Sequence, residues 1–162
     1  MKMLKHKSRL ILTLALAVVA TPVLSFSAEE KKMDPLMEPV KSVYDHYLAI
    51  QKELAQDSIK GVDEHASAIA KAVEQDDMKM LSPDVAKQAQ TLAKAKDLKA
   101  ARDADKPLSQ SLIKYLADNK AGKGMYHEAY CPMVKASWLQ TDKAIKNPYM
   151  GKAMLGCGEL RN

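Results

Sequence analysis

The 162-residue chain contains 25 Lys and Arg against 20 Asp and Glu, which gives a formal net charge of +5. Four of the basic residues and none of the acidic ones lie in residues 1–9, so the rest of the chain carries 21 basic and 20 acidic side chains. Because this balance leaves no basic stripe with interleaved aromatic residues, the composition argues against nucleic-acid binding.

Residues 1–27 have the three parts of a secretory signal peptide. A basic start is followed by an uncharged apolar run over residues 10–20 and by a Ser-Phe-Ser sequence that ends at Ser27, with small residues suited to cleavage. The apolar run is shorter than the about 20 residues that a membrane-spanning helix needs. We therefore expect an exported, periplasmic protein without a membrane span after cleavage, in a compartment where cysteines are commonly oxidised.

Residues 28–38 are polar and contain proline, which predicts a flexible lead-in. Residues 39–162 are long enough for a single domain with one core. Apolar residues then recur at spacings of three and four, as in amphipathic helices. The first helix is expected to begin near Pro39 and to end near Asp57, and Ser58 is expected to cap the second helix.

The next two helices have clearer start signals. Ser82 followed by Pro83 predicts the third helix, and Asp97 predicts the cap of the fourth. The pattern of the fourth continues to Asn119 with Pro107 inside it, where proline kinks or divides a helix. No alternating strand pattern precedes residue 125. The predicted fold is therefore all-α: an up-and-down four-helix bundle with an irregular Cys- and Met-rich C-terminal segment and a short terminal helix.

The bundle region contains no phosphate loop, nucleophile elbow or HExxH motif, and we expect no enzyme active site in it. His46 and His65 are each isolated on a predicted helix, which favours surface or ordinary core histidines over ligands. A thiol oxidoreductase is also disfavoured, because the two cysteines do not form a C-x-x-C motif.

Soft sulfur donors are concentrated in the C-terminal third of the chain. Cys131 and Met133 lie in a C-P-M motif, and Met154 and Cys157 lie in an M-x-x-C motif. Thiolate and thioether sulfur suit Cu(I) and Ag(I), whereas thioether is a poor ligand for zinc. These four residues are the predicted metal ligands.

Three further residues have favourable spacing for the same site. Met125 and His127 would share a face with the first cysteine in an extended segment, and Met150 would share a face with the second in a short helix that begins at Pro148. Trp138, in the sequence S-W-L-Q, is expected to fill the core from another short helix.

The two cysteines have a second interpretation. A disulfide between Cys131 and Cys157 would close a loop of about 26 residues and stabilise the fold by roughly 3–4 kcal/mol in the chain-entropy model. The residues alone favour the disulfide and the metal site equally, and one thiol pair is able to alternate between the two states.

Three stretches form a longer pattern: V-Y-D-H-Y-L in the first helix, K-P-L-S-Q-S-L in the fourth, and Y-C-P-M followed by N-P-Y-M-G and M-L-x-C-G-E. From Val40 to Leu160 the chain resembles a bacterial family of proteins of unknown function, DUF3347. Members of that family occur as exported proteins and fused to CusB-like periplasmic adaptors of copper and silver efflux pumps, which implies a role in heavy-metal resistance. The family pattern falls on Cys131, Pro132, Met133, Trp138, Asn147, Pro148, Tyr149, Gly151, Met154, Cys157 and Gly158.

The sequence thus leads to two hypotheses. The first is a periplasmic protein that binds Cu(I) or a similar soft ion through Cys131, Met133, Met154 and Cys157. It would buffer the ion or deliver it to an efflux adaptor or another envelope protein. The second is a helical interaction module of the cell envelope that is stapled by the disulfide and has no metal role.

Overall fold

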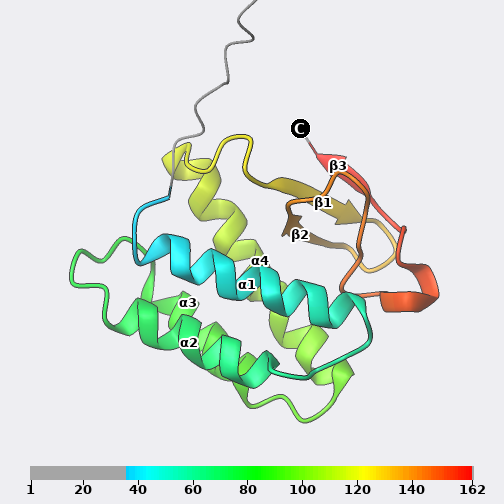
Figure 1. Ribbon diagram of the computed structural model, residues 1–162, viewed down its shortest axis with the longest axis horizontal. Coiled ribbons are helices and arrows are strands. Elements are labelled where there is room, and N and C mark those ends of the chain that lie inside the picture. The colour runs from blue at the N-terminus through cyan, green and yellow to red at the C-terminus, as the bar shows by residue number, and fades with distance from the viewer. Residues whose placement is uncertain (1–35, 162) are drawn as a thin grey trace, which may run out of the picture. The chain divides into compact units, whose positions relative to one another are not determined.

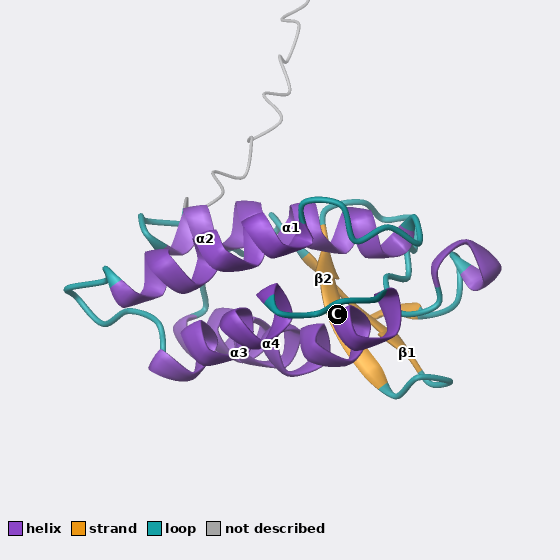
Figure 2. Ribbon diagram, turned by 90° about the horizontal axis from the view of Figure 1, so that it is seen from below, coloured by secondary structure: helices purple, strands orange, loops and turns teal. Residues whose placement is uncertain are grey.

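The computed structural model describes residues 36–161, so the predicted signal peptide lies outside the described residues. The first elements of the chain are the helices α1 (Val40–Ala55), α2 (Val62–Glu74), α3 (Pro83–Ala93) and α4 (Leu98–Asn119). Figures 1 and 2 show α1 and α2 in one layer and α3 and α4 in a second layer. Within the described residues, none of the helices is long and apolar enough to cross a membrane.

The all-α prediction is wrong, because the C-terminal segment forms a three-stranded antiparallel sheet beside α1 and α4 (Figure 1). The strands are β1 (His127–Cys131), β2 (Ala136–Gln140) and β3 (Glu159–Arg161), in the order β2-β1-β3. The strands are short and contain no β-branched residue, so their local propensity is weak. The turn before β2 ends at Lys135 with a φ of 49°, a position where hairpins usually place Gly or Asn.

The predicted terminal helix is also wrong, because only one 3₁₀ turn, η1 (Gly151–Met154), forms there. The predicted start signal is nevertheless used: the side-chain oxygen of Asn147 accepts hydrogen bonds from the two backbone N–H groups at 2.9 and 3.0 Å that follow Pro148. Gly151 has a φ of 57°, so the chain leaves the helical path at once. The expected helical face of two methionines and Cys157 therefore does not form.

Capping side chains mark the starts of two of the four helices. Ser82 and Asp97 accept hydrogen bonds from N–H groups in the first turns of α3 and α4, as predicted. The second helix begins later than predicted, because Ser58 accepts a hydrogen bond within a turn and Gly61, at a φ of 73°, precedes the helix instead. Pro107 lies inside α4 and does not divide it.

The sheet separates two hydrophobic clusters. The larger one fills the bundle, and Leu139 of β2 contributes to it. Trp138, the preceding residue, points to the opposite face because side chains alternate along a strand. It is fully buried in a strand rather than in the expected short helix. The second cluster consists of Ala129, Cys131, Ala136, Trp138 and Tyr149.

Candidate functional site

The two cysteines meet at the second cluster. Cys131 is the last residue of β1 and is fully buried, while Cys157 lies between η1 and β3 and is partly exposed. Their Sγ atoms are 2.8 Å apart, and both cysteines are free. The C-P-M and M-x-x-C motifs, far apart in the sequence, therefore form one site with one sulfur inside the protein and the other near its surface.

Pairing within the sheet positions Cys131. It lies opposite Ala136 of β2, whose side chain is a single methyl group. Trp138 and Tyr149 fill the same cluster, with their rings edge to face and the ring centroids 6.0 Å apart. The sulfur of Cys131 is therefore held on a rigid strand and shielded from water.

Asn147 positions Cys157. The Asn147 side chain is fully buried, and its Nδ2 donates a hydrogen bond to the backbone carbonyl of Cys157 at 2.7 Å. The backbone N–H of Asn147 donates to the carbonyl of Leu155 at 2.8 Å. Together with the two hydrogen bonds that its Oδ1 accepts, these contacts close the loop from residue 147 to residue 157 and bring the second thiol back to the sheet.

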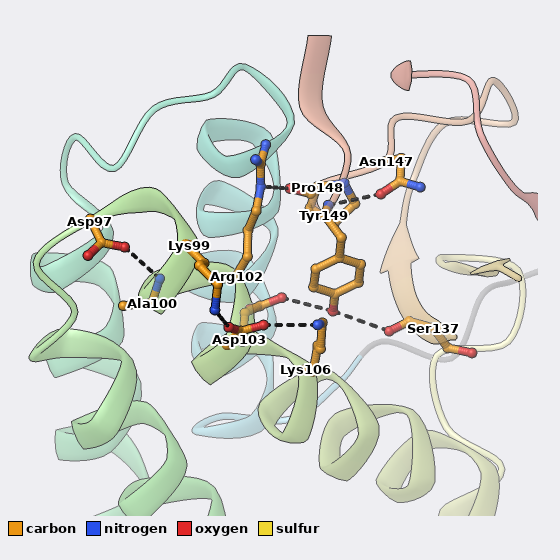
Figure 3. A network of polar contacts seen from close by, with 11 residues as sticks. Asp97, Lys99, Ala100, Arg102, Asp103, Lys106, Ser137, Asn147, Pro148 and Tyr149 are labelled. Carbon is orange, nitrogen blue, oxygen red and sulfur yellow. Dashed lines mark hydrogen bonds and ion pairs between the residues drawn. The ribbon is translucent and has the colours of Figure 1, made fainter. Parts of the chain in front are cut away.

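Arg102 of α4 attaches this loop to the bundle, as Figure 3 shows at Pro148. Its Nε donates to the carbonyl of Pro148 at 2.7 Å, and its Nη2 donates to the carbonyl of Leu54 at 2.9 Å and to the carboxylate of Asp57 at 2.6 Å. The hydrogen bond from Arg102, and then the one from the backbone N–H of Lys152, lower the pKa of Asp57. One guanidinium thus joins α1, α4 and the loop.

Two glycines permit this close approach. Gly151 has a positive φ, and a Cβ atom there would collide with the side chains of Asp57 and Arg102. Gly158 has a φ of 137°, and a Cβ atom there would lie 2.8 Å from the carbonyl oxygen of Tyr130 and 3.0 Å from the ring of Trp138. Larger residues at either position would move the loop away from α4 or from the sheet.

The surroundings of Cys131 favour its thiolate. Burial opposes the charged form, but hydrogen bonding with Cys157, with the backbone of Val134 and Met133 and with the side chain of Asn147 favours it. The net effect is to lower the pKa of Cys131. The pKa of Cys157 is raised, mainly because of its hydrogen bond with Cys131 and also because of burial. The two sulfurs therefore share one hydrogen bond, and their pKa values shift in opposite directions.

The backbone of each of the two predicted methionine ligands lies close to a cysteine. Met133 lies in the turn after β1, and its backbone N–H donates to the sulfur of Cys131. The carbonyl of Met154 accepts a hydrogen bond from the backbone N–H of Cys157 at 2.9 Å. The methionine side chains are 62% and 40% exposed, respectively. Both methionine side chains are therefore accessible to solvent, and each is within three residues of a cysteine in the chain.

The three additional candidates are placed less favourably. His127 begins β1 and is four residues from Cys131, which is about 13 Å along a strand. Met125 precedes His127 in the chain and lies before the strand begins. Met150 is partly buried against the second cluster, where it serves packing. The geometry therefore leaves Met133 and Met154 as the better thioether candidates.

The helical part of the chain identifies its family. Residues 43–124 match the family described as "Protein of unknown function (DUF3347)". The chain belongs to this family. The DUF3347 match begins within α1 and ends before β1, so it covers the rest of α1, the other three helices and neither cysteine. No curated protein and no solved structure matches the chain.

A buried carboxylate connects the DUF3347 helices to the C-terminal lobe, the name used here for residues 125–161. Asp105 of α4 is fully buried and accepts hydrogen bonds from Gln51 at 2.8 and 3.0 Å, from the Tyr149 hydroxyl at 3.0 Å and from Ser109 at 3.2 Å. Figure 3 shows Tyr149 reaching from the lobe towards α4 and Ser137. Despite these hydrogen bonds, burial raises the pKa of Asp105 to about 6.

Tyr47 extends this network to the sheet. Its hydroxyl lies 2.7 Å from the Oγ of Ser109 and accepts a hydrogen bond from the backbone N–H of Leu139 at 3.1 Å. The sequence analysis missed the network, although one signal was present. Asp105 lies four residues after Ala101 and three before Leu108, so it falls on the apolar stripe of α4, where a carboxylate needs hydrogen-bond partners.

Proposed function

We propose that this protein binds a soft monovalent ion, Cu(I) or Ag(I), through Cys131 and Cys157, and that it buffers or transfers the ion in the periplasm. The supporting observation is that the two thiol sulfurs lie 2.8 Å apart, one on a rigid strand and the other on a partly exposed loop. Thiolate sulfur is a ligand that selects Cu(I) over harder ions.

The donor set of this site disfavours zinc. Structural zinc sites use four ligands from Cys, His, Asp and Glu. Within residues 36–161 there is no group of three or more such side chains that could hold a metal ion. Met133 and Met154 instead offer thioethers, which are soft, neutral and flexible. A rotation of either side chain towards the thiols would complete a sulfur-rich coordination shell.

Release of the ion would occur by ligand exchange. A partner's sulfur must approach from solvent, and the exposed ligands of this site are Cys157, Met133 and Met154. Cys131 would hold the ion until the exposed ligands had been replaced. A sulfur-bearing envelope protein, such as a periplasmic efflux adaptor, is the proposed recipient.

A Cu(I) titration against a competing chromophoric chelator tests this proposal. The reduced protein is expected to bind one equivalent, and both thiols are expected to become unreactive. Cys131→Ser and Cys157→Ser should each abolish tight binding while the helical circular dichroism stays unchanged. Met133→Leu and Met154→Leu should weaken binding less, and Met78→Leu, at a residue that is 73% exposed on the bundle, serves as the matched control. Undiminished affinity in Cys131→Ser would overturn the proposal.

The disulfide-stapled interaction module is the second candidate function, because the same 2.8 Å contact also suits a covalent bond between the two sulfurs. Thiol counting on protein isolated from the periplasm separates the two functions. A pair that is always oxidised and that resists mild reductant would favour the staple. Two thiols that are free, and that Cu(I) protects from alkylation, would favour the metal site.

A further inference from the structure

The two histidines that the sequence analysis treated as isolated lie against each other. Nδ1 of His46 in α1 is 2.9 Å from Nδ1 of His65 in α2. The ring centroids are 5.2 Å apart, and the ring planes are inclined by 45°. Both residues are half-buried, and among residues 36–161 each ring has only the other as a hydrogen-bond partner.

We infer that His46 and His65 form a second metal site, one for a divalent ion such as Cu²⁺. Imidazole nitrogen suits copper and zinc, and Cu²⁺ is bound most tightly of the first-row divalent ions. Metal–imidazole bonds are about 2.0–2.1 Å long, and Cu²⁺ prefers a square-planar arrangement, so two neighbouring nitrogen ligands lie about 2.9 Å apart. The observed distance between the two Nδ1 atoms is 2.9 Å, so reorientation of the rings would admit the ion, and water would fill the remaining positions.

The two helices hold the imidazoles in place. His46 is followed by Tyr47, and His65 is followed by Ala66, and both of these neighbours are fully buried in the bundle core. The backbone at each histidine is therefore fixed by packing, and only side-chain rotation is needed to bind an ion. Such preorganisation reduces the entropy cost of binding.

The charges around the pair also bear on the proposal. His65 lies in the first turns of α2, where the helix dipole disfavours a cation. Asp63 and Glu64 occupy the same first turn, and Asp45 precedes His46 in α1, although Asp45 also pairs with Lys41. These carboxylates offset the dipole, so a divalent ion does not meet a net positive end.

A direct hydrogen bond between the imidazoles is the competing explanation. In that arrangement one Nδ1 donates and the other accepts, and no ion is needed. The two explanations differ in their response to added metal. They also differ from the thiol site, because the histidine pair would bind Cu²⁺ without either cysteine.

The test uses a variant with both Cys131→Ser and Cys157→Ser, in which Cu²⁺ has no thiol to oxidise. A calorimetric titration with Cu²⁺ is expected to show one bound equivalent. The melting temperature of the variant is expected to rise when Cu²⁺ is bound. Adding His46→Gln or His65→Gln should weaken binding at least tenfold. Adding His127→Gln, the matched control at a histidine on β1, should leave the affinity unchanged.

Electron paramagnetic resonance of the bound Cu²⁺ provides a measurement that needs no histidine variant, and two nitrogen ligands are expected. The inference is overturned by absence of binding, by an affinity in His46→Gln or His65→Gln that equals that of the parent variant, or by a spectrum without nitrogen ligands. Cu(I) affinity of the thiol site should be the same with and without His46→Gln, so the two sites can fail separately.

Discussion

The helical bundle and the C-terminal lobe are stabilised in different ways. In the bundle, apolar side chains at helical spacing bury one another, and no single contact decides the arrangement. In the lobe, the largest buried side chain is Trp138, and the loop depends on the polar groups of Asn147 and Arg102 and on two glycines. The comparison teaches that the lobe's geometry, and with it the thiol pair, rests on a few residues that each have several partners.

The largest expected effect comes from Trp138→Ala, which should cost about 3–5 kcal/mol because it leaves a large cavity in the second cluster. If the lobe is energetically separate, both thiols should become reactive towards an alkylating reagent while the helical circular dichroism remains. Leu112→Ala, at a fully buried residue of the bundle, should cost about 2–5 kcal/mol and unfold both regions together. Loss of the helices at the same urea concentration as exposure of the thiols in Trp138→Ala would contradict the separation.

The junction between the two regions should depend on pH through Asp105. Its pKa is about 6 in the folded protein and about 3.8 when unfolded, so the folded state binds more protons between these values. The stability that this group contributes is therefore greatest below pH 4 and is lost as the pH rises through 6, by about 3 kcal/mol in total. The measurement is the free energy of unfolding from pH 4 to pH 8, compared with that of Asp105→Asn.

Asp105→Asn is expected to lack this decrease. The Oε1 of Gln51 is buried without a partner, so rotation of the Gln51 amide lets it accept a hydrogen bond from the new amide group. Asp103→Asn, in the same helix, is the control, because the hydrogen bonds from Lys99 and Lys106 lower the pKa of Asp103 to about 2. A parallel pH profile for the wild type and Asp105→Asn would show that the junction does not titrate.

Asn147→Ala should have the next largest effect, about 2–3 kcal/mol, because it leaves buried groups of the loop without hydrogen bonds. The substitution should also increase the alkylation rate of Cys157, because the backbone carbonyl of Cys157 loses the hydrogen bond that holds this residue near the sheet. Asn119→Ala, at an exposed residue that donates to the carbonyl of Tyr115, is the matched control and should change stability little. Equal alkylation rates of Cys157 in both variants would show that Asn147 does not position Cys157.

The smallest effect is expected for Lys114→Ala on the bundle surface. Lys114 pairs with Asp118 at 2.7 Å, but both side chains are mostly exposed, so the pair contributes about 0.3–0.5 kcal/mol. Arg102→Ala, which removes three hydrogen bonds at the junction, should cost more. Urea unfolding of the two variants measures the difference, and equal losses would show that the junction is no more sensitive than the surface.

The sequence by itself determined the helices and the residues of the candidate site. Apolar spacing and the caps at Ser82 and Asp97 are local signals, because they act within one or two helical turns. The C-P-M and M-x-x-C motifs also named both thiols, although spacing alone could not show that the sulfurs meet. Ser58 was a wrong cap, since local turn chemistry competed with helix initiation there.

Only the tertiary structure decided the sheet, the contact between the two thiols, the buried Asp105 network and the histidine pair. Each of these depends on partners far apart in the chain, such as Cys131 with Cys157 and His46 with His65. The strands have weak local propensity, and they form because pairing and the burial of Trp138 offset the entropy of ordering the segment. Local patterns in a sequence indicate the periodicity of a helix or strand, whereas the elements that it packs against are decided by the packing of the whole chain.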